Sequence, residues 1–366
     1  MSTDTGTPMT PLTKDALQHA LDDALALRND ATDALSQETF SGAAAWGSRD
    51  AHPEWAIGPF TRDPALTFAP TGQWPDPTGI GWTAESIFNP SVIHDGDDLV
   101  MFYRASPRKE STSSRIGMAR LTPGAGSRWA DDTAGPIVFP TLDNELLGCE
   151  DPKIYRAEGR WFLFYNGIFP ATEDARAAFP SPGYPVETVG CDINLAVSDD
   201  LVTWQKLGPI IDHETSRLWA KGAVITRDPD GNAAKLGGEY LMFLSEGCDG
   251  RMVVGRSTDM FDWTFDEQPY LSLAPLGGHL HEVACAVVGH REGELLLDFF
   301  YSDAEGEFAA GQALYDVAAP FTQRALSIGG SLSWGGLLQH DGRWLLAQGW
   351  DAPAGTREIS LYTAPL

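Results

Sequence analysis

One hairpin pattern recurs five times along the 366 residues of this chain, and that recurrence limits the folds open to it. In the two clearest copies a hairpin opens at Asn89 and returns at Arg104, or opens at Asp151 and returns at Asn166, fifteen positions apart in both cases (104 − 89 and 166 − 151). The other three copies open at Lys221, Glu282 and Trp334. Self-similarity at a period of roughly 50–65 residues is typical of β-propellers. The sequence therefore predicts an all-β chain that folds as a five-bladed β-propeller.

A second motif supports the same repeat, because it occurs at the same distance after two of these hairpins. The segments 198–204 and 257–263 share the spacing Ser-x-Asp-x-x-x-Trp, and each comes directly after a predicted strand. Two independent repeats in one phase favour a true structural period over a chance match.

The first 83 residues do not follow the repeat. Thr13 can cap a helix over 14–35 with one apolar stripe, which would pack on the flank of the propeller or serve as an oligomer contact. Residues 40–83 are rich in Gly, Pro, Trp and Asp, which favours an irregular segment laid on the propeller that could supply its closing strand. We therefore expect an N-terminal helix and irregular segment over 1–83, and a catalytic propeller domain over 84–366.

Composition excludes several classes of partner. The formal net charge of −26 disfavours binding to nucleic acid and to anionic lipid surfaces. No twenty-residue apolar run predicts a membrane span, and the first residues lack the basic start and apolar centre of a signal peptide, so we expect a cytoplasmic location. The four cysteines form no C-x-x-C pair and are expected to be small buried side chains.

The residues that open the five repeats are expected to meet around the propeller axis. They are Asn89, Asp151, Lys221, Glu282 and Trp334. Two carboxylates, a cation, an amide and an indole would then converge on one funnel. Paired carboxyl groups are what cleavage of a glycosidic bond requires, one protonated to donate to the leaving oxygen and one ionised.

The dipeptide Glu150-Asp151 stands at the mouth of the second hairpin, and Pro152 is expected at the first residue of its strand. Strand alternation predicts that Glu150 and Asp151 point in different directions, so that only one of them lies in the cleft. Glu282 is the expected second carboxylate, and Glu246 is a competitor for that role.

Cations distinguish two reactions at such a site. Inverting hydrolysis leaves room for a water, whereas phosphorolysis fills the same space with phosphate and calls for several basic side chains. Arg104, Lys153, Lys221 and His281 are the candidates for binding substrate or phosphate, with Asn89, Glu150 and Trp334 as further substrate-binding positions. Metal binding is not required by either reaction.

The residues quoted above resemble glycoside hydrolase family 130, through Phe88-Asn89-Pro90, Tyr103-Arg104, Glu150-Asp151-Pro152-Lys153 and the Ser-x-Asp-x-x-x-Trp element. The resemblance covers about residues 85–320 and implies a five-bladed propeller, related in architecture to families 43, 32, 68 and 117, that acts on mannosides. It implies that Asp151 is the general acid and that Arg104 lies in the substrate or phosphate pocket. Lys153 departs from the arginine usual in the family, and lysine cannot make the bidentate contact to phosphate.

The sequence thus predicts a glycosidase that cleaves a small glycoside or oligosaccharide by inversion, with Asp151 as acid and Glu282 as the second carboxylate. Related families place the acid on a later blade, so an exchange of roles between these two residues is the alternative. Two other functions stay open: an inverting mannoside phosphorylase that uses inorganic phosphate, and a sugar-binding propeller without catalysis. The expected partners are carbohydrate, inorganic phosphate for the second function, and a second copy of the chain. No cofactor or metal is expected.

Overall fold

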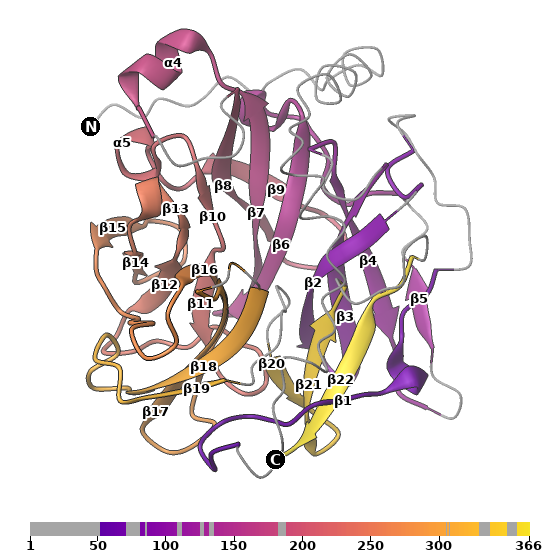
Figure 1. Ribbon diagram of the computed structural model, residues 1–366. Coiled ribbons are helices and arrows are strands. Elements are labelled where there is room, and N and C mark those ends of the chain that lie inside the picture. Colours follow the sequence, from indigo (N-terminus) through magenta and orange to yellow (C-terminus); the bar gives the residue numbers. More distant parts are fainter. Residues whose placement is uncertain are drawn as a thin grey trace.

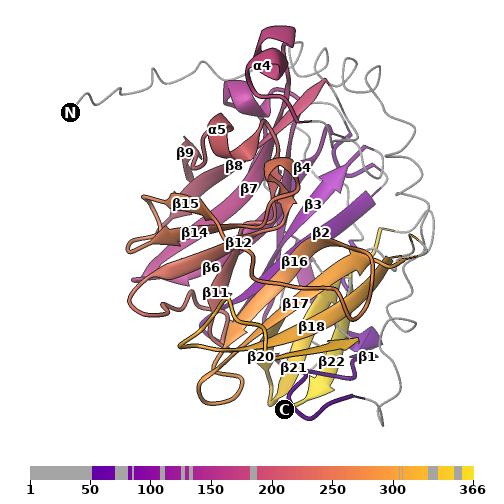
Figure 2. The same cartoon turned by 60° about the vertical axis from the view of Figure 1, so that its left-hand side comes forward.

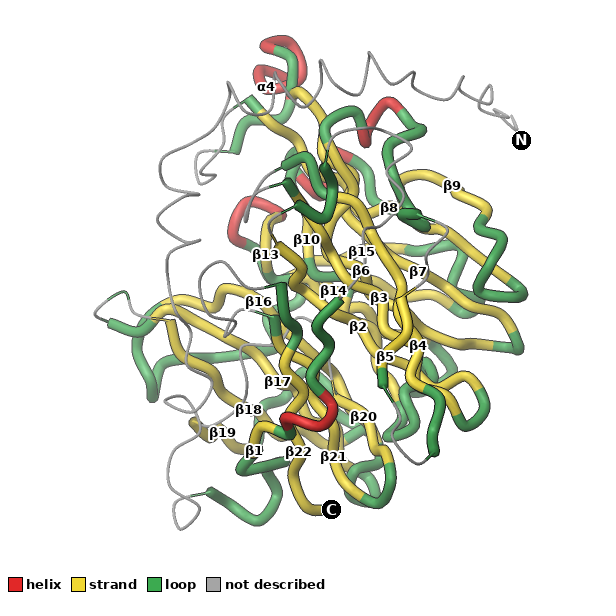
Figure 3. Tube along the Cα trace, turned by 90° about the vertical axis from the view of Figure 1, so that its right-hand side faces the viewer, coloured by secondary structure: helices red, strands yellow, loops and turns green. Residues whose placement is uncertain are grey.

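The computed structural model describes residues 52–70, 81–84, 86–107, 112–124, 128–131, 135–181, 188–304, 306, 308–328, 337–349 and 357–366. The predicted helix over 14–35 and the candidate Trp334 lie outside these residues. The described chain is mostly β-structure with a few short helices, as Figure 3 shows. Among the described residues, no helix is long and apolar enough to cross a membrane.

In the described part of the chain, the strands form five four-stranded antiparallel units that follow one another along the sequence. Unit one contains β2 (Ser86–Asp95), β3 (Asp98–Ser106), β4 (Arg115–Leu121) and β5 (Trp129–Asp131). Unit two contains β6 (Gly148–Ala157), β7 (Arg160–Pro170), β8 (Val189–Ser198) and β9 (Gln205–Pro209). Unit three contains β11 (Val224–Arg227), β12 (Tyr240–Leu244), β14 (Val253–Ser257) and β15 (Thr264–Glu267).

Unit four contains β16 (His279–Val288), β17 (Glu294–Ser302), β18 (Phe308–Asp316) and β19 (Ala325–Ile328). Unit five contains β20 (Leu337–His340), β21 (Arg343–Gln348), β22 (Ser360–Pro365) and β1 (Thr61–Arg62). Units three and four join through a parallel pairing of β11 with β16. A separate short pair links β10 (Ala220–Lys221) to β13 (Glu246–Gly247).

The short helices lie in the connections between strands. They are η2 (Pro64–Leu66), η3 (Asp143–Glu145), α4 (Glu173–Ala178), α5 (His213–Ser216) and η4 (Cys248–Gly250). Figure 1 shows α4 beyond the ends of β7 and β8, in the long connection that joins these two strands.

Apolar contacts join each unit to the next and the fifth unit to the first. Buried clusters combine side chains from units one and two, two and three, three and four, four and five, and five and one. Figures 1 and 2 show the same order, with unit five (yellow) beside unit one (violet) and unit four (orange). Because each sheet buries its faces against both neighbours, the core is divided among the five contacts between units.

The chain closes this arrangement with a strand from its N-terminal part. β1 pairs with β22 through Thr61↔Thr363 and Arg62↔Tyr362. Phe68 continues the contact as a bridge to Ile359. The 40–83 segment therefore supplies a closing strand, as expected, whereas the domain boundary at residue 83 stays a prediction.

The two Ser-x-Asp-x-x-x-Trp segments adopt one and the same turn. In both, the serine Oγ accepts from the backbone N–H three residues later, at 2.9 Å. The aspartates Asp200 and Asp259 each accept from two further backbone N–H groups. These side chains replace the strand hydrogen bonds that end there, which explains why the motif follows the third strand of a unit.

Candidate active site

The first strands of units one and two, β2 and β6, each contain a bulge at a residue that precedes proline. The β2–β3 register jumps between Phe88 and Ser91, and the β6–β7 register jumps between Glu150 and Lys153. Proline has no N–H to donate to the ladder, so the pairing is interrupted there.

Asn89 and Asp151 are the bulged residues, and both have φ of 47°. This left-handed conformation is strained for most side chains and is best tolerated by Asn and Asp. From its missing N–H, Pro152 was predicted at the start of its strand. That expectation is wrong, because β6 begins at Gly148 and Pro152 lies inside the bulge, the other place where a sheet accepts proline.

The bulge also overturns the prediction that Glu150 and Asp151 point in different directions. Strand alternation holds only while the backbone stays regular, and the left-handed residue turns the second side chain toward the first. Both carboxylates contact Arg104 and both contact Lys221. The two acids therefore act as one group.

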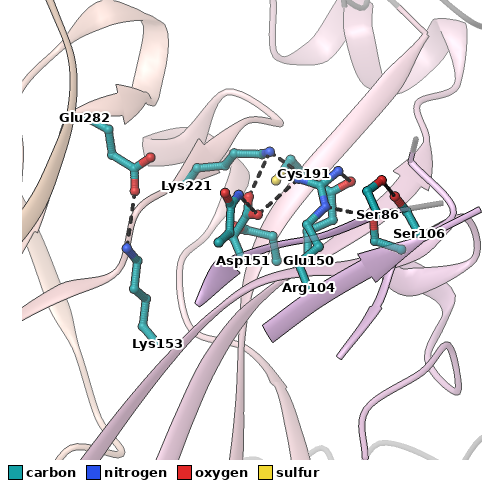
Figure 4. A network of polar contacts seen from close by, with 12 residues as sticks. Ser86, Arg104, Ser106, Glu150, Asp151, Lys153, Cys191, Lys221 and Glu282 are labelled. Carbon is teal, nitrogen blue, oxygen red and sulfur yellow. Dashed lines mark hydrogen bonds and ion pairs between the residues drawn. The ribbon is translucent and has the colours of Figure 1, made fainter. Parts of the chain in front are cut away.

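Arg104, Glu150, Lys221 and Asp151 form a closed ring of alternating charges, which we call the ion quartet (Figure 4). Arg104 donates from Nη2 to Glu150 Oε1 at 2.7 Å and from Nη1 to Asp151 Oδ1 at 3.0 Å. Lys221 Nζ donates to Glu150 Oε2 at 2.9 Å and to Asp151 Oδ2 at 3.1 Å. All four carboxylate oxygens are thus engaged by cations, and the quartet is electrically neutral.

Neighbouring side chains hold the members of the quartet in place. Asn89 Nδ2 donates a short hydrogen bond to Asp151 Oδ1. Arg104 Nε donates to Ser114 Oγ at 2.7 Å, and the guanidinium lies 4.6 Å from the centre of the Phe88 ring. A buried guanidinium fixed by both its hydrogen bonds and a ring face loses little further freedom on binding a ligand.

The surroundings shift the pKa values of the two acids of the quartet in opposite directions. Burial would raise the pKa of Asp151, but the charges of Lys221 and Arg104 and the Asn89 hydrogen bond outweigh it and hold that pKa far below its ordinary value. Burial raises the pKa of Glu150 above its usual value in spite of the two cations. Burial would lower the pKa of Lys221, but Asp151 and Glu150 raise it well above its usual value.

Glu282, on β16, is the third buried acid of the site and is only 1% exposed. Its Oε1 lies 3.7 Å from Lys153 Nζ, and its Oε2 has no hydrogen-bond partner in the described part of the chain. Burial raises the pKa of Glu282 to about 8, although the Lys153 charge opposes this. Burial likewise lowers the pKa of Lys153. A carboxyl group with this environment carries its proton at neutral pH.

Gly222 makes room for Glu282 beside the quartet. A Cβ at this position would stand 2.8 Å from Glu282 Oε1, and the glycine has φ of +71°. Since Lys221 immediately precedes Gly222, the Glu282 carboxyl lies next to the quartet, and Figure 4 shows the pair of Glu282 and Lys153 to one side of it.

Lys221 on β10, Glu246 on β13 and His281 on β16 of unit four lie at the more exposed border of the site. The Lys221 side chain is 13% exposed, against 3% for Arg104 and Glu150 and 6% for Asp151. Glu246 pairs with Lys221 across β10 and β13 and is partly exposed. His281 is partly exposed and stacks on Phe300 at 4.7 Å between ring centres. Burial lowers the pKa of His281.

The structure thus brings most of the predicted residues together. Five of them meet in or on the quartet: Asn89, Arg104, Glu150, Asp151 and Lys221. Lys153 and Glu282 form the adjoining pair, and His281 precedes Glu282 on β16. No group of three His, Cys, Asp or Glu among the described residues is arranged to hold a metal ion.

Sequence reasoning missed two supporting residues, Ser114 and Gly222. Ser114 lies in a polar loop whose contact with Arg104 depends on the folded path of that loop. Gly222 follows the predicted Lys221 directly, and a glycine at the opening of a strand is a signal for close approach of another group.

Comparison with known proteins agrees with this geometry. The profile of the family Glyco_hydro_130, described as β-1,4-mannooligosaccharide phosphorylase, matches residues 78–179, which include both bulges. A 1,2-β-oligomannan phosphorylase from Thermoanaerobacter sp. (strain X514) is 24% identical over 249 residues, 65% of this chain and 72% of the relative.

Two solved structures share the fold. One comes from work on the GH130 family of mannoside phosphorylases, which contains glycoside hydrolases that target β-1,2-mannosidic linkages in Candida mannan. It has a TM-score of 0.62 at 18% identity, and the match covers 86% of this chain and 96% of that structure. The other is the β-1,2-mannobiose phosphorylase from Listeria innocua in complex with β-1,2-mannobiose, with a TM-score of 0.54 at 14% identity, covering 76% of this chain and 90% of its own.

This chain is similar to glycoside hydrolase family 130. The resemblance seen in the sequence is confirmed by the family profile and by the structural neighbours. The matched residues 78–179 include three members of the quartet, Arg104, Glu150 and Asp151, and also Asn89. Lys221 and Glu282 lie beyond the profile, and their place in the site comes from the structure.

Proposed function

We propose that the five units are the blades of a five-bladed β-propeller whose inner strands surround one axis. The closed order of contacts between units supports this, since the fifth packs against the first. Among the inner strands, β2 also contacts β6 directly, and β11 contacts β16. In such a fold the bulged ends of the inner strands face the same opening, which is where the quartet lies.

We propose further that the protein cleaves β-mannosidic bonds in oligosaccharides and transfers the mannosyl group to inorganic phosphate. The names of the related phosphorylases support the substrate class and the acceptor. The observation in the site that carries the proposal is the different placement of its buried acids: Glu282 has one oxygen without a hydrogen-bond partner among the described residues, whereas Glu150 and Asp151 are each bound to two cations.

Phosphorolysis with inversion needs one acid and no base, because phosphate is itself the nucleophile. A phosphate oxygen forms a bond to C1 of the mannosyl unit while the bond from C1 to the glycosidic oxygen breaks. The leaving oxygen takes one proton from a carboxylic acid. The products are a mannose 1-phosphate of inverted configuration and a shortened saccharide.

Glu282 is our candidate for this acid, and the geometry favours the exchanged roles of the two carboxyl groups. Its Oε2 atom has no other hydrogen-bond partner among the described residues, and its pKa of about 8 keeps it protonated. Asp151 has both oxygens bound to cations and would stabilise positive charge that develops at C1. Arg104 and Lys221 would attract the phosphate.

The test is a phosphate-dependence assay on β-1,2- and β-1,4-linked mannobiose, with products followed by ³¹P and ¹H NMR. We expect turnover to require phosphate and to yield a sugar phosphate with the α configuration. Full turnover in phosphate-free buffer, with free mannose as product, contradicts phosphorolysis.

Hydrolysis is the second candidate, because one further carboxylate could serve as its base. Glu246 is partly exposed, pairs with Lys221 across β10 and β13, and lies close enough to Glu282 to raise the pKa of that group. Inverting hydrolysis needs a base for the attacking water. If activity persists without phosphate and Glu246→Gln abolishes it, the hydrolytic function is supported.

A further inference from the structure

We propose that Glu150 takes up one proton when inorganic phosphate binds to Arg104 and Lys221, so that the ion quartet stays close to electrical balance. This inference rests on the proposed phosphorolysis. It makes Glu150 a positioning residue, which holds a proton and orients the acceptor phosphate, and it gives the neighbouring Asp151 a different task.

The charge balance of the quartet is the first reason. Two cations and two carboxylates already neutralise one another in a buried setting, with 3% of Glu150 and Arg104 exposed. An oxyanion that binds both cations leaves an excess of negative charge there, and uncompensated buried charge is costly. Protonation of one carboxylate halves the excess that a bound dianion brings, from two negative charges to one, with no movement of the backbone.

The contacts of the two acids decide which one accepts the proton. Asp151 receives a third hydrogen bond, from Asn89, which favours its ionised form. Glu150 is bonded only to Arg104 and Lys221 in the described part of the chain, so an oxyanion that draws these cations away leaves it without donors. A protonated Glu150 could then donate its O–H to a phosphate oxygen.

The remaining groups around Glu150 do not offer a better proton acceptor. Cys191 on β8 faces Glu150 and Lys221, and burial and the nearby acids keep this thiol protonated. Among the described residues, the other charged groups near the quartet include Glu246 on β13, His281 and Glu282 on β16, and Lys153 on β6. Burial raises the pKa of Glu150 itself above its usual value, which favours Glu150 over Asp151 as the group that accepts the proton.

The oxyanion can approach the quartet from the side of Lys221. This side chain is 13% exposed, whereas the other three members are 3–6% exposed. Lys221 is also the member whose bonds reach both carboxylates from a separate short strand, β10. An anion that enters here meets Lys221 first and then displaces Glu150 from it.

Linkage between proton and anion gives the inference a measurable consequence. If one proton is taken up for each anion bound, affinity falls about tenfold for each unit of pH above the pKa of Glu150. Sulfate is the probe of choice, because it stays a dianion across the neutral range and cannot itself account for a proton.

The experiment is isothermal titration of the full chain with sulfate at about pH 7 in buffers of different ionisation enthalpy, which reports the protons taken up per ion bound. We expect about one proton per sulfate for the natural chain and close to none for Glu150→Gln, which also binds sulfate more tightly above neutral pH. Glu246→Gln, a matched loss of one carboxylate beside Lys221, should retain the uptake.

Sulfate binding without proton uptake would overturn the inference, as would uptake that persists in Glu150→Gln or disappears in Glu246→Gln. Absence of binding at tens of millimolar sulfate would also overturn it. The two proposals fail separately. Phosphate-dependent turnover without proton uptake contradicts this inference alone, whereas proton uptake in a protein without phosphate-dependent turnover contradicts the proposed function alone.

Discussion

The bulges of β2 and β6 have the same backbone and complementary side chains. Both place a residue with φ of 47° before a proline, and both interrupt the pairing with the next strand at the same point. The bulged residue is the hydrogen-bond donor Asn89 in unit one and the acceptor Asp151 in unit two, and the two bond to each other.

The side chains next to the two bulges are also complementary to each other. Phe88 in unit one corresponds to Glu150 in unit two, and Arg104 in unit one corresponds to Asn166 in unit two. Unit one thus supplies a cation, a donor and a ring face, whereas unit two supplies both carboxylates. One repeated backbone feature carries a binding site because its two copies bear unlike side chains.

Asp151→Asn should have the largest effect, since it gives both bulges the same residue. The quartet then holds two cations and one anion, and breaking a buried ion pair costs about 3–5 kcal/mol. We expect loss of at least about a thousandfold in kcat. Denaturant unfolding and steady-state kinetics measure these effects, with the exposed Asp199→Asn as control. Activity close to that of the natural chain would remove Asp151 from the mechanism.

Glu282→Gln tests the acid that neither bulge supplies. The folded-state pKa of about 8 lies above the ordinary 4.5, so the folded state keeps its proton where the unfolded state loses it. This contribution to stability is complete below pH 4.5 and is lost as pH rises through about 8. The loss is on the order of a few kcal/mol, at about 1.4 kcal/mol per pKa unit.

In Glu282→Gln the fall in stability between these two pH values should be smaller than in the natural chain. Chemical denaturation across this range measures the difference. An equal fall in both proteins would mean that Glu282 is ionised in the folded state.

Asn89→Asp makes unit one resemble unit two and places a third carboxylate against Asp151. Like charges at hydrogen-bond distance cannot both stay ionised, so the pair should share one proton and the variant should lose stability as pH rises. We expect a cost of about 2–3 kcal/mol above neutral pH and little cost in acid. Unfolding midpoints measured in acid and in mild alkali give this comparison. A cost independent of pH would point to a steric cause.

Ser91→Ala should have the smallest effect and tests the link between the two bulged strands. Ser91 Oγ accepts from the backbone N–H of Ile154 at 3.1 Å, and both groups are buried. Loss of this acceptor should cost about 1–2 kcal/mol and leave kcat within a few-fold. Thermal or denaturant unfolding detects this change, with the exposed Ser181→Ala as control. A loss of activity as large as that of Asp151→Asn would show that the link fixes the quartet itself.

Sequence periodicity located the bulges but not the direction of their side chains. The fifteen-residue spacing identified Asn89 and Asp151 as equivalent positions, and it holds in the structure. Alternation along a strand then failed at Asp151, because its left-handed backbone turns its side chain to the same side as that of Glu150. A bulge depends on pairing with a second strand, so a single run of residues indicates it only through the proline.

The protonation states of the buried acids could not be predicted from the sequence. The pairing of Lys153 with Glu282 joins unit two to unit four, and nothing in the spacing of the repeats indicates which side chains meet across that distance. Burial raises the pKa of Glu282, whereas two cations and Asn89 lower the pKa of Asp151 against the effect of burial, and both environments exist only in the assembled units. The predicted role of Trp334 stays a prediction, since this residue lies outside the described part of the chain.

The pairing of β1 with β22 has a consequence for synthesis on the ribosome. Thr61 and Arg62 emerge early, but their partners Thr363 and Tyr362 are added about 300 residues later. At roughly 5–20 residues per second, the early segment waits tens of seconds for its partner while units one to four are already being made. A nascent chain that stalls before residue 360 would therefore carry four assembled units and an unpaired N-terminal strand. This incomplete form would be exposed to chaperones and proteases before the complete fold exists.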